Sequence, residues 1–91
     1  MILLDTNVLS ELMKTTPDSQ VQAWINTQLI STLFISTITQ AEIEYGIALL
    51  PNGKRKQDLQ ATAKQMFAKF SGRCLVFGET AATYYGEIAA Q

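Results

Sequence analysis

The start of the chain constrains the fold most, because four apolar residues are followed at once by the carboxylate of Asp5. An uninterrupted apolar run is typical of a parallel strand that is buried on both faces. Such a strand carries the next residue to the carboxyl edge of the sheet, where open α/β sheets bind ligands. Asp5 is therefore the first candidate for a functional residue.

A second stretch has the same form, with a short apolar strand at 33–35 followed by polar residues and a helix over about 39–50. In a projection at 100° per residue, Glu42 falls on the apolar side of this helix. Its neighbours there are Ile38, Tyr45, Gly46 and Leu49. A carboxylate on such a side loses hydration and needs a partner that offsets the cost. We therefore predict that Asp5 and Glu42 meet around a divalent metal ion.

The rest of the chain alternates helices and strands, which predicts an α/β fold with a parallel sheet and right-handed crossovers. Further helices are expected over 6–13, 19–29 and 54–70, a third strand over 74–77, and a last helix with Ala81, Tyr84, Tyr85 and Ile88 turned inward. Trp24 is expected to anchor its helix in the core, and Gly46 to allow another backbone to approach closely.

We expect one domain over 1–91. Because no helix-ending signal follows Ala89, we also expect the domain to be cut short at its C-terminal end.

Composition excludes several kinds of chemistry. The chain has no histidine, which removes the usual serine and cysteine triads, and its single cysteine, Cys74, is expected to be a small buried residue. Any chemistry must therefore rest on carboxylates. The net charge of −1 means that a polyanionic substrate would need a metal ion and local basic residues. Without a signal peptide or an apolar run long enough for a bilayer, we expect a cytoplasmic protein with no membrane contact.

Both acids also have a purely structural interpretation. Asp5 could cap the helix that follows it, and Thr39 and Glu42 have the spacing of a capping box. If the helix that carries Glu42 begins nearer Thr37, that capping box cannot form. Thr6, Asn7 and Ser36 could orient the acids or a metal-bound water. Lys54, Arg55 and Lys56 could steer a polyanionic substrate toward the site, although a basic run at a helix start is more often a solvated face.

The start Met-Ile-Leu-Leu-Asp5-Thr6-Asn7, together with the stretch Ile-Thr-Gln-Ala-Glu42-Ile-Glu-Tyr-Gly46 at this distance, resembles the PIN-domain ribonucleases of the VapC toxin type, closest to the FitB-like branch. The resemblance runs along the entire chain. It implies a PIN-like three-layer α/β/α fold, here with only the first three strands and their helices. It also implies a family strand order of 3-2-1-4-5, in which residues 1–4 would be left as an apolar sheet edge prone to aggregation.

The resemblance further implies a magnesium- or manganese-dependent endoribonuclease that is the toxin of a bacterial type II toxin-antitoxin pair and works as a homodimer. By the motif, Asp5 and Glu42 correspond to the first two acids of the family's metal site. The third and fourth acids belong to a later strand and helix that this sequence does not contain. We therefore expect weak metal affinity and little or no cleavage from this form.

The chemistry of magnesium agrees with this expectation. Mg²⁺ prefers hard oxygen ligands and keeps several waters, so converging carboxylates can hold it while a phosphate oxygen and an attacking water bind beside it. Two alternatives remain at this point. One is a catalytically incomplete PIN remnant that only binds an antitoxin or a second copy of itself. The other is a phosphohydrolase with Asp5 as nucleophile, which is weaker because Asn7 stands where such enzymes carry a second aspartate.

Overall fold

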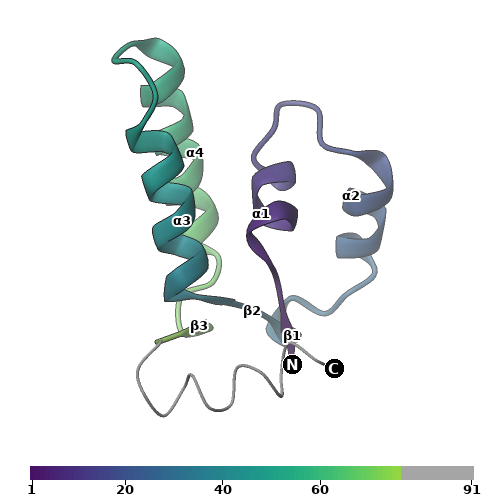
Figure 1. Ribbon diagram of the computed structural model, residues 1–91. Helices are drawn as coiled ribbons and strands as arrows, with labels where there is room; N and C mark the ends of the chain where they lie inside the picture. The colour runs from purple at the N-terminus through teal and green to yellow at the C-terminus, as the bar shows by residue number, and fades with distance from the viewer. Residues whose placement is uncertain (77–91) are drawn as a thin grey trace.

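The computed structural model describes residues 1–76, which form a three-stranded sheet and the helices that cover it (Figure 1). The strands are β1 (Ile2–Leu3), β2 (Leu33–Ser36) and β3 (Cys74–Leu75). They are parallel and lie in the order β1-β2-β3, with Ile2 opposite Leu33 and Ile35 opposite Cys74. The predicted parallel α/β architecture is confirmed.

The helices follow the predicted order, with small shifts of their ends. They are α1 (Thr6–Leu12), α2 (Ser19–Asn26), the short 3-10 helix η1 (Ile30–Thr32), α3 (Thr37–Ala48) and α4 (Lys54–Ala68). Figure 1 shows α3 and α4 side by side, with α1 next to α3 and α2 on the far side of α1. The predicted end of the third strand at Phe77 and the last predicted helix lie outside the described residues.

The core lies where the sheet meets α1, α3 and α4. Its buried side chains are Leu4, Leu9, Leu33, Ile35, Ile43, Ile47, Ala63, Met66 and Phe70. Leu4 and Leu33 come from the strand regions that the sequence predicted as buried runs, and the amide of Leu4 extends the pairing by donating to Phe34 O at 2.8 Å. This packing fixes the residue after Leu4, which is Asp5, at the carboxyl edge of the sheet.

Three sequence expectations about packing are wrong. Trp24 does not anchor its helix, since 43% of its surface is exposed and α2 touches the core only through the half-buried Ile25. A Cβ at Gly46 would meet nothing within 4 Å in the described part of the chain, so no backbone approaches there. Cys74 is only half-buried, with its Sγ 3.9 Å from Gln40 Oε1. Short amphipathic segments do not reveal how closely their neighbours approach.

Within residues 1–76, none of the helices has the length and apolar character needed to cross a membrane.

Candidate functional site

Asp5 occupies the junction between β1 and α1. Its backbone is extended, and its Oδ1 accepts a hydrogen bond from the Val8 amide at 2.8 Å, so Asp5 is the N-cap of α1. The capping interpretation is therefore correct, but it uses only one carboxylate oxygen. Oδ2 has no hydrogen-bond partner within residues 1–76, and the side chain is exposed. Asp5 can thus cap the helix and still offer an oxygen to a ligand.

Glu42 lies in the second turn of α3, and its helix begins earlier than the capping-box interpretation requires. The N-cap is Ser36, whose Oγ accepts from the Thr39 amide at 3.2 Å, and the first helical residue is Thr37. The proposed box between Thr39 and Glu42 is therefore wrong. Glu42 is left free to interact outside its own helix.

The expected burial of Glu42 is also wrong, because its side chain is exposed. The apolar residues on the same side of α3 are exposed too: Ile38 by 43%, Tyr45 by 67% and Leu49 by 67%. A different face of α3 packs on the core, through Ile43 and Ile47. This helix is apolar on two faces, so its sequence alone could not show which face is covered.

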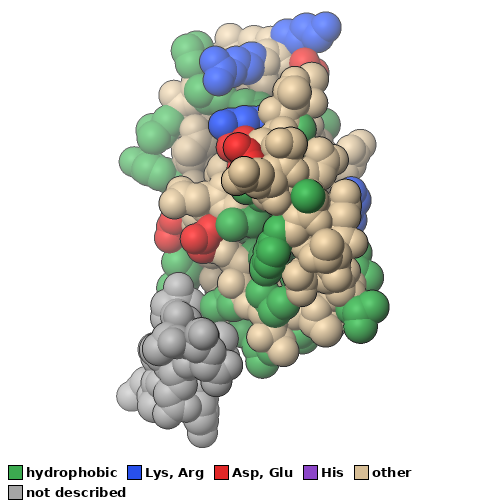
Figure 2. Space-filling view, turned by 90° about the vertical axis from the view of Figure 1, so that its right-hand side faces the viewer, with side chains coloured by type: hydrophobic (Ala, Val, Ile, Leu, Met, Phe, Trp, Pro, Cys, Tyr) green, Lys and Arg blue, Asp and Glu red, His purple; other side chains and the backbone are tan. Residues whose placement is uncertain are grey.

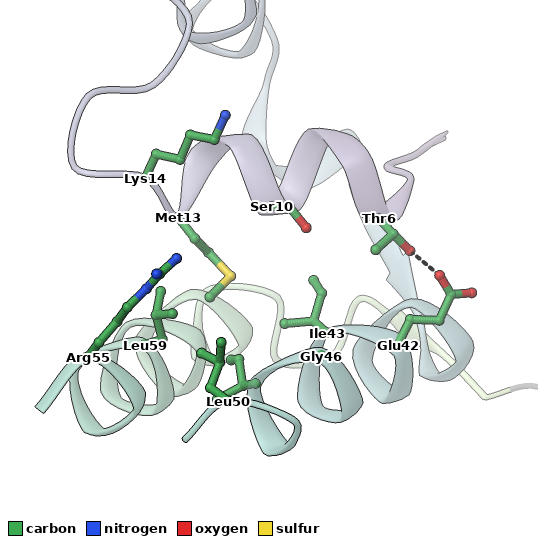
Figure 3. A pocket seen from close by; sticks show the side chains of 11 residues that line it. Thr6, Ser10, Met13, Lys14, Glu42, Ile43, Gly46, Leu50, Arg55 and Leu59 are labelled. Atoms are coloured by element: carbon green, nitrogen blue, oxygen red, sulfur yellow. Dashed lines mark hydrogen bonds between the residues drawn. The ribbon is translucent and has the colours of Figure 1, made fainter. Parts of the chain in front are cut away.

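Thr6 connects the two elements that carry the acids. Its Oγ1 donates a hydrogen bond to Glu42 Oε2 at 2.9 Å, from the first residue of α1 to the second turn of α3 (Figure 3). The carboxylate of Glu42 is therefore held beside the residue that follows Asp5. This contact spans 36 residues of sequence and brings the two predicted stretches together at one edge of the sheet.

The other two residues considered for orientation take no part in this contact. Ser36 is buried and bonds only within the first turn of α3, where its Oγ also lies 3.3 Å from Thr39 Oγ1. Asn7 is exposed and makes no hydrogen bond to either acid in the part of the chain described here. The structure thus gives Ser36 a helix-capping role and gives Thr6 the contact with an acid.

A cleft of about 300 Å³ opens between α1, α3 and the start of α4 (Figure 3). Thr6 and Glu42 line one end of it, and Lys14 and Arg55 line the other. Lys14 and the cleft itself were not found from the sequence, because Lys14 follows α1 with no motif around it. In the space-filling view, blue basic side chains lie mainly in the upper half of the molecule, and red acidic side chains lie among and below them (Figure 2).

The three basic residues at the start of α4 have different surroundings. Lys56 Nζ donates to Ala48 O at 3.1 Å and lies 3.4 Å from Asn52 Oδ1, so it is hydrogen-bonded at the C-terminal end of α3. Arg55 lines the cleft, and Lys54 lines a neighbouring depression. Only two of the three basic side chains therefore face a groove.

The donors at the Thr6 end of the cleft suit a hard divalent ion. They are carboxylate oxygens on exposed side chains and the hydroxyl of the half-buried Thr6, which leaves room for the waters that Mg²⁺ keeps. Within residues 1–76, no group of three or more Asp, Glu, Cys or His side chains converges in a way that could hold a metal. The structure therefore joins Glu42 to Thr6, the residue next to Asp5, and residues 1–76 bring no cluster of three such side chains to this place.

Glu11, at the far side of α1, is engaged elsewhere. Its carboxylate pairs with Lys14 Nζ at 2.6 Å and accepts from the Asp18 amide at 2.7 Å. The hydrogen bond from Lys14, and then that from the Asp18 amide, hold the pKa of Glu11 below its ordinary value of 4.5. Glu11 thus fastens the turn between α1 and α2 and does not join the candidate site.

Comparison with known proteins places these features in a family. The model of the PIN domain matches residues 2–91. VapC ribonuclease Y4jK from Sinorhizobium fredii is 45% identical over 92 residues, covering 100% of this chain and 66% of that protein. Plasmid stability protein StbB from Pseudomonas syringae pv. tomato shows the same identity and coverage. Toxin FitB from Neisseria gonorrhoeae is 43% identical over 89 residues, covering 97% of this chain and 64% of that protein.

Solved structures agree with the sequence relatives. The structure of FitAB bound to the IR36 DNA fragment superposes with a TM-score of 0.83 at 42% identity, covering 96% of this chain and 62% of that one. FitAcB from Neisseria gonorrhoeae gives a TM-score of 0.82 at 42% identity, covering 99% of this chain and 66% of that one. The chain spans just under two thirds of the length of the curated relatives it matches first. On the family model and these similarities, the chain belongs to the PIN domain family, as a relative of VapC- and FitB-type proteins.

Proposed function

We propose that this chain carries part of the metal site of a divalent-metal-dependent endoribonuclease, the toxin of a type II toxin-antitoxin pair. The observation that carries the proposal is the hydrogen bond from Thr6 to Glu42, which holds the α3 carboxylate next to the junction that Asp5 caps. The names of the relatives, a VapC ribonuclease and a FitB toxin, support the reaction and the biological class.

In this proposal each residue has a separate task. Asp5, which caps α1 through Oδ1, and Glu42, which accepts a hydrogen bond from Thr6 through Oε2, would hold the ion with their carboxylates. Thr6 restricts the rotation of the Glu42 carboxylate and so positions it. Bound Mg²⁺ or Mn²⁺ would supply activation of a water and compensation of charge on the phosphate. No histidine is required for this chemistry.

The partners belong to the same proposal. We propose that the protein binds RNA as substrate, a cognate antitoxin protein and a second copy of itself in a homodimer. The solved structures of FitAB and FitAcB support the antitoxin partner. We also propose that residues 1–91 form one PIN domain to which further acids, beyond those described, contribute the remaining ligands.

A cleavage assay on RNA with Mg²⁺ or Mn²⁺ tests the site assignment. Asp5→Asn keeps a capping side chain but removes the charge, and Glu42→Gln removes the second charge from an exposed position. Because loss of an outer partner of a metal ligand already costs 10- to 100-fold, we expect each variant to lose at least about 100-fold in activity. Glu44→Gln is the matched control, since Glu44 is exposed on the same helix and contacts Gln40.

Activity that is equal in the wild type, Asp5→Asn and Glu42→Gln would remove the nuclease assignment from these residues. A protein that carries the remaining acids and binds its antitoxin, yet shows no metal-dependent cleavage, would instead favour a module that only binds partners.

A further inference from the structure

The cleft at Thr6 and Glu42 continues into a second depression, of about 520 Å³. The two hollows share four lining residues, which are Met13, Lys14, Arg55 and Leu59. The second hollow extends the first toward Thr15 and Lys54. Together they form one groove between α1, α3 and the first half of α4, called the α1–α4 groove below.

Charge changes sign along the α1–α4 groove. Glu42 and Thr6 stand at one end, and Lys14, Lys54 and Arg55 stand at the other. Because an α-helix rises about 1.5 Å per residue, the part of α3 from Glu42 to its end at Ala48 is about 9 Å long, so the two ends of the groove lie roughly that far apart. A chain with regularly spaced negative charges fits this pattern, with one charge at the metal end and others at the basic end.

The cations at the basic end differ in how free they are. Lys14 is paired with Glu11 at 2.6 Å, and Asp58 also lines the outer hollow. The side chain of Arg55 forms neither an ion pair nor a hydrogen bond with any residue from 1 to 76, and it reaches across the groove toward Met13 (Figure 3). A guanidinium with free donors binds phosphate in a bidentate manner.

Between its charged ends, the groove is walled by apolar side chains. Met13, Leu50 and Leu59 are all half-buried there, so part of each remains accessible. Single-stranded RNA exposes base faces that pack on such surfaces, whereas a duplex keeps its bases stacked and offers mainly phosphates and sugars. An apolar wall beside a phosphate-binding cation therefore favours a single strand.

We infer that the α1–α4 groove holds a single-stranded segment of the RNA substrate, with Arg55 binding a backbone phosphate a few nucleotides from the cleaved bond. The inference rests on the proposed ribonuclease function and specifies its substrate. Arg55 is a positioning residue, and Lys14 and Lys54 add attraction at the same end. Lys56 takes no part, because its amine is hydrogen-bonded to the last carbonyl of α3.

The test is equilibrium binding of a short labelled single-stranded oligoribonucleotide in EDTA, measured at several salt concentrations. Loss of one phosphate contact lowers the slope of log K against log salt by about 0.7, which corresponds to about five-fold weaker binding near 0.1 M salt. We expect this change in Arg55→Gln and rescue of the slope in Arg55→Lys. Lys64→Gln is the control, since Lys64 is an exposed cation on α4 that lines a different hollow.

Two further comparisons sharpen the test. The wild type should bind the single strand more tightly than a duplex of the same sequence. In cleavage assays, Arg55→Gln should raise KM and leave kcat nearly unchanged.

An unchanged slope in Arg55→Gln, an equal loss in Lys64→Gln, or equal affinity for single strand and duplex would overturn the inference. A loss of antitoxin binding in Arg55→Gln without any change in RNA binding would assign the groove to a protein instead. Because binding is measured without metal, the result does not depend on cleavage. RNA that binds through Arg55 but is never cut would contradict the nuclease proposal and leave the groove assignment standing.

Discussion

Thr6 is the residue on which the geometry of the candidate site depends. It was one of three residues considered for an orienting role, and its hydroxyl is the one that contacts an acid, Glu42, at 2.9 Å. Hydrogen bonds to carboxylate ligands fix their orientation and raise their affinity for metal ions. Sequence spacing could suggest this role but could not choose Thr6 over Asn7 or Ser36, since the choice depends on how α3 packs against α1.

Replacing Thr6 tests this role. Thr6→Val keeps the shape of the side chain but removes the donor, so we expect about 10-fold weaker binding of Mn²⁺ and a matching loss of activity at limiting metal. Thr6→Ser keeps the hydroxyl and should bind metal as the wild type does. Calorimetric titration of Mn²⁺ measures both. Equal affinities in Thr6→Val and the wild type would show that the contact is incidental.

Glu11 gives a prediction about pH at the same scale. Its pKa in the folded protein is lowered by Lys14 and then by the Asp18 amide, so its contribution to stability is present above the ordinary value of 4.5. That contribution is lost as the pH falls through the lowered folded-state pKa. When the pH is lowered below about 4.5, the free energy of unfolding should therefore fall less in Glu11→Gln than in the wild type. Urea unfolding of both proteins from pH 3 to 7 measures this difference. A free energy of unfolding that changes equally with pH in the variant and the wild type would contradict it.

Among the elements, α3 shows most clearly what a sequence predicts and what it does not. Its position, its polar start and its acid were all visible, and Ser36 caps it through the Thr39 amide. Its covered face was not visible, because apolar residues occur on two sides and only Ile43 and Ile47 reach the core. Glu42 was singled out as a buried charge, yet it is exposed and hydrogen-bonded to α1.

Gly46 provides a prediction about α3 itself. Glycine inside a helix is destabilising by about 0.5–1 kcal/mol relative to alanine, and an added Cβ would meet no atom within 4 Å in residues 1–76. Gly46→Ala should therefore raise the free energy of unfolding by about that amount. The midpoint of urea unfolding measures the change. A lower midpoint in Gly46→Ala would mean that another segment packs against this position.

At the scale of the whole molecule, the alternation of strands and helices was enough to predict a parallel α/β fold, and the resemblance to PIN-domain ribonucleases gave its strand order. Within residues 1–76, β1 pairs with β2 alone, as expected for the first three strands of that order. The α1–α4 groove could not be predicted, because it brings together Lys14, Glu42 and Arg55 from three separate helical regions. Such a surface depends on the packing of elements and leaves no local motif.

The central claim is that Asp5 and Glu42 bind the same ion, and a double-mutant cycle of Mn²⁺ affinity tests it most directly. The proteins compared are the wild type, Asp5→Asn, Glu42→Gln and the double variant, each checked for an unchanged unfolding midpoint. If one ion touches both carboxylates, each single change should weaken binding, and the double change should cost clearly less than the sum of the two. Unchanged affinity in either single variant, or losses that add fully, would contradict a shared site.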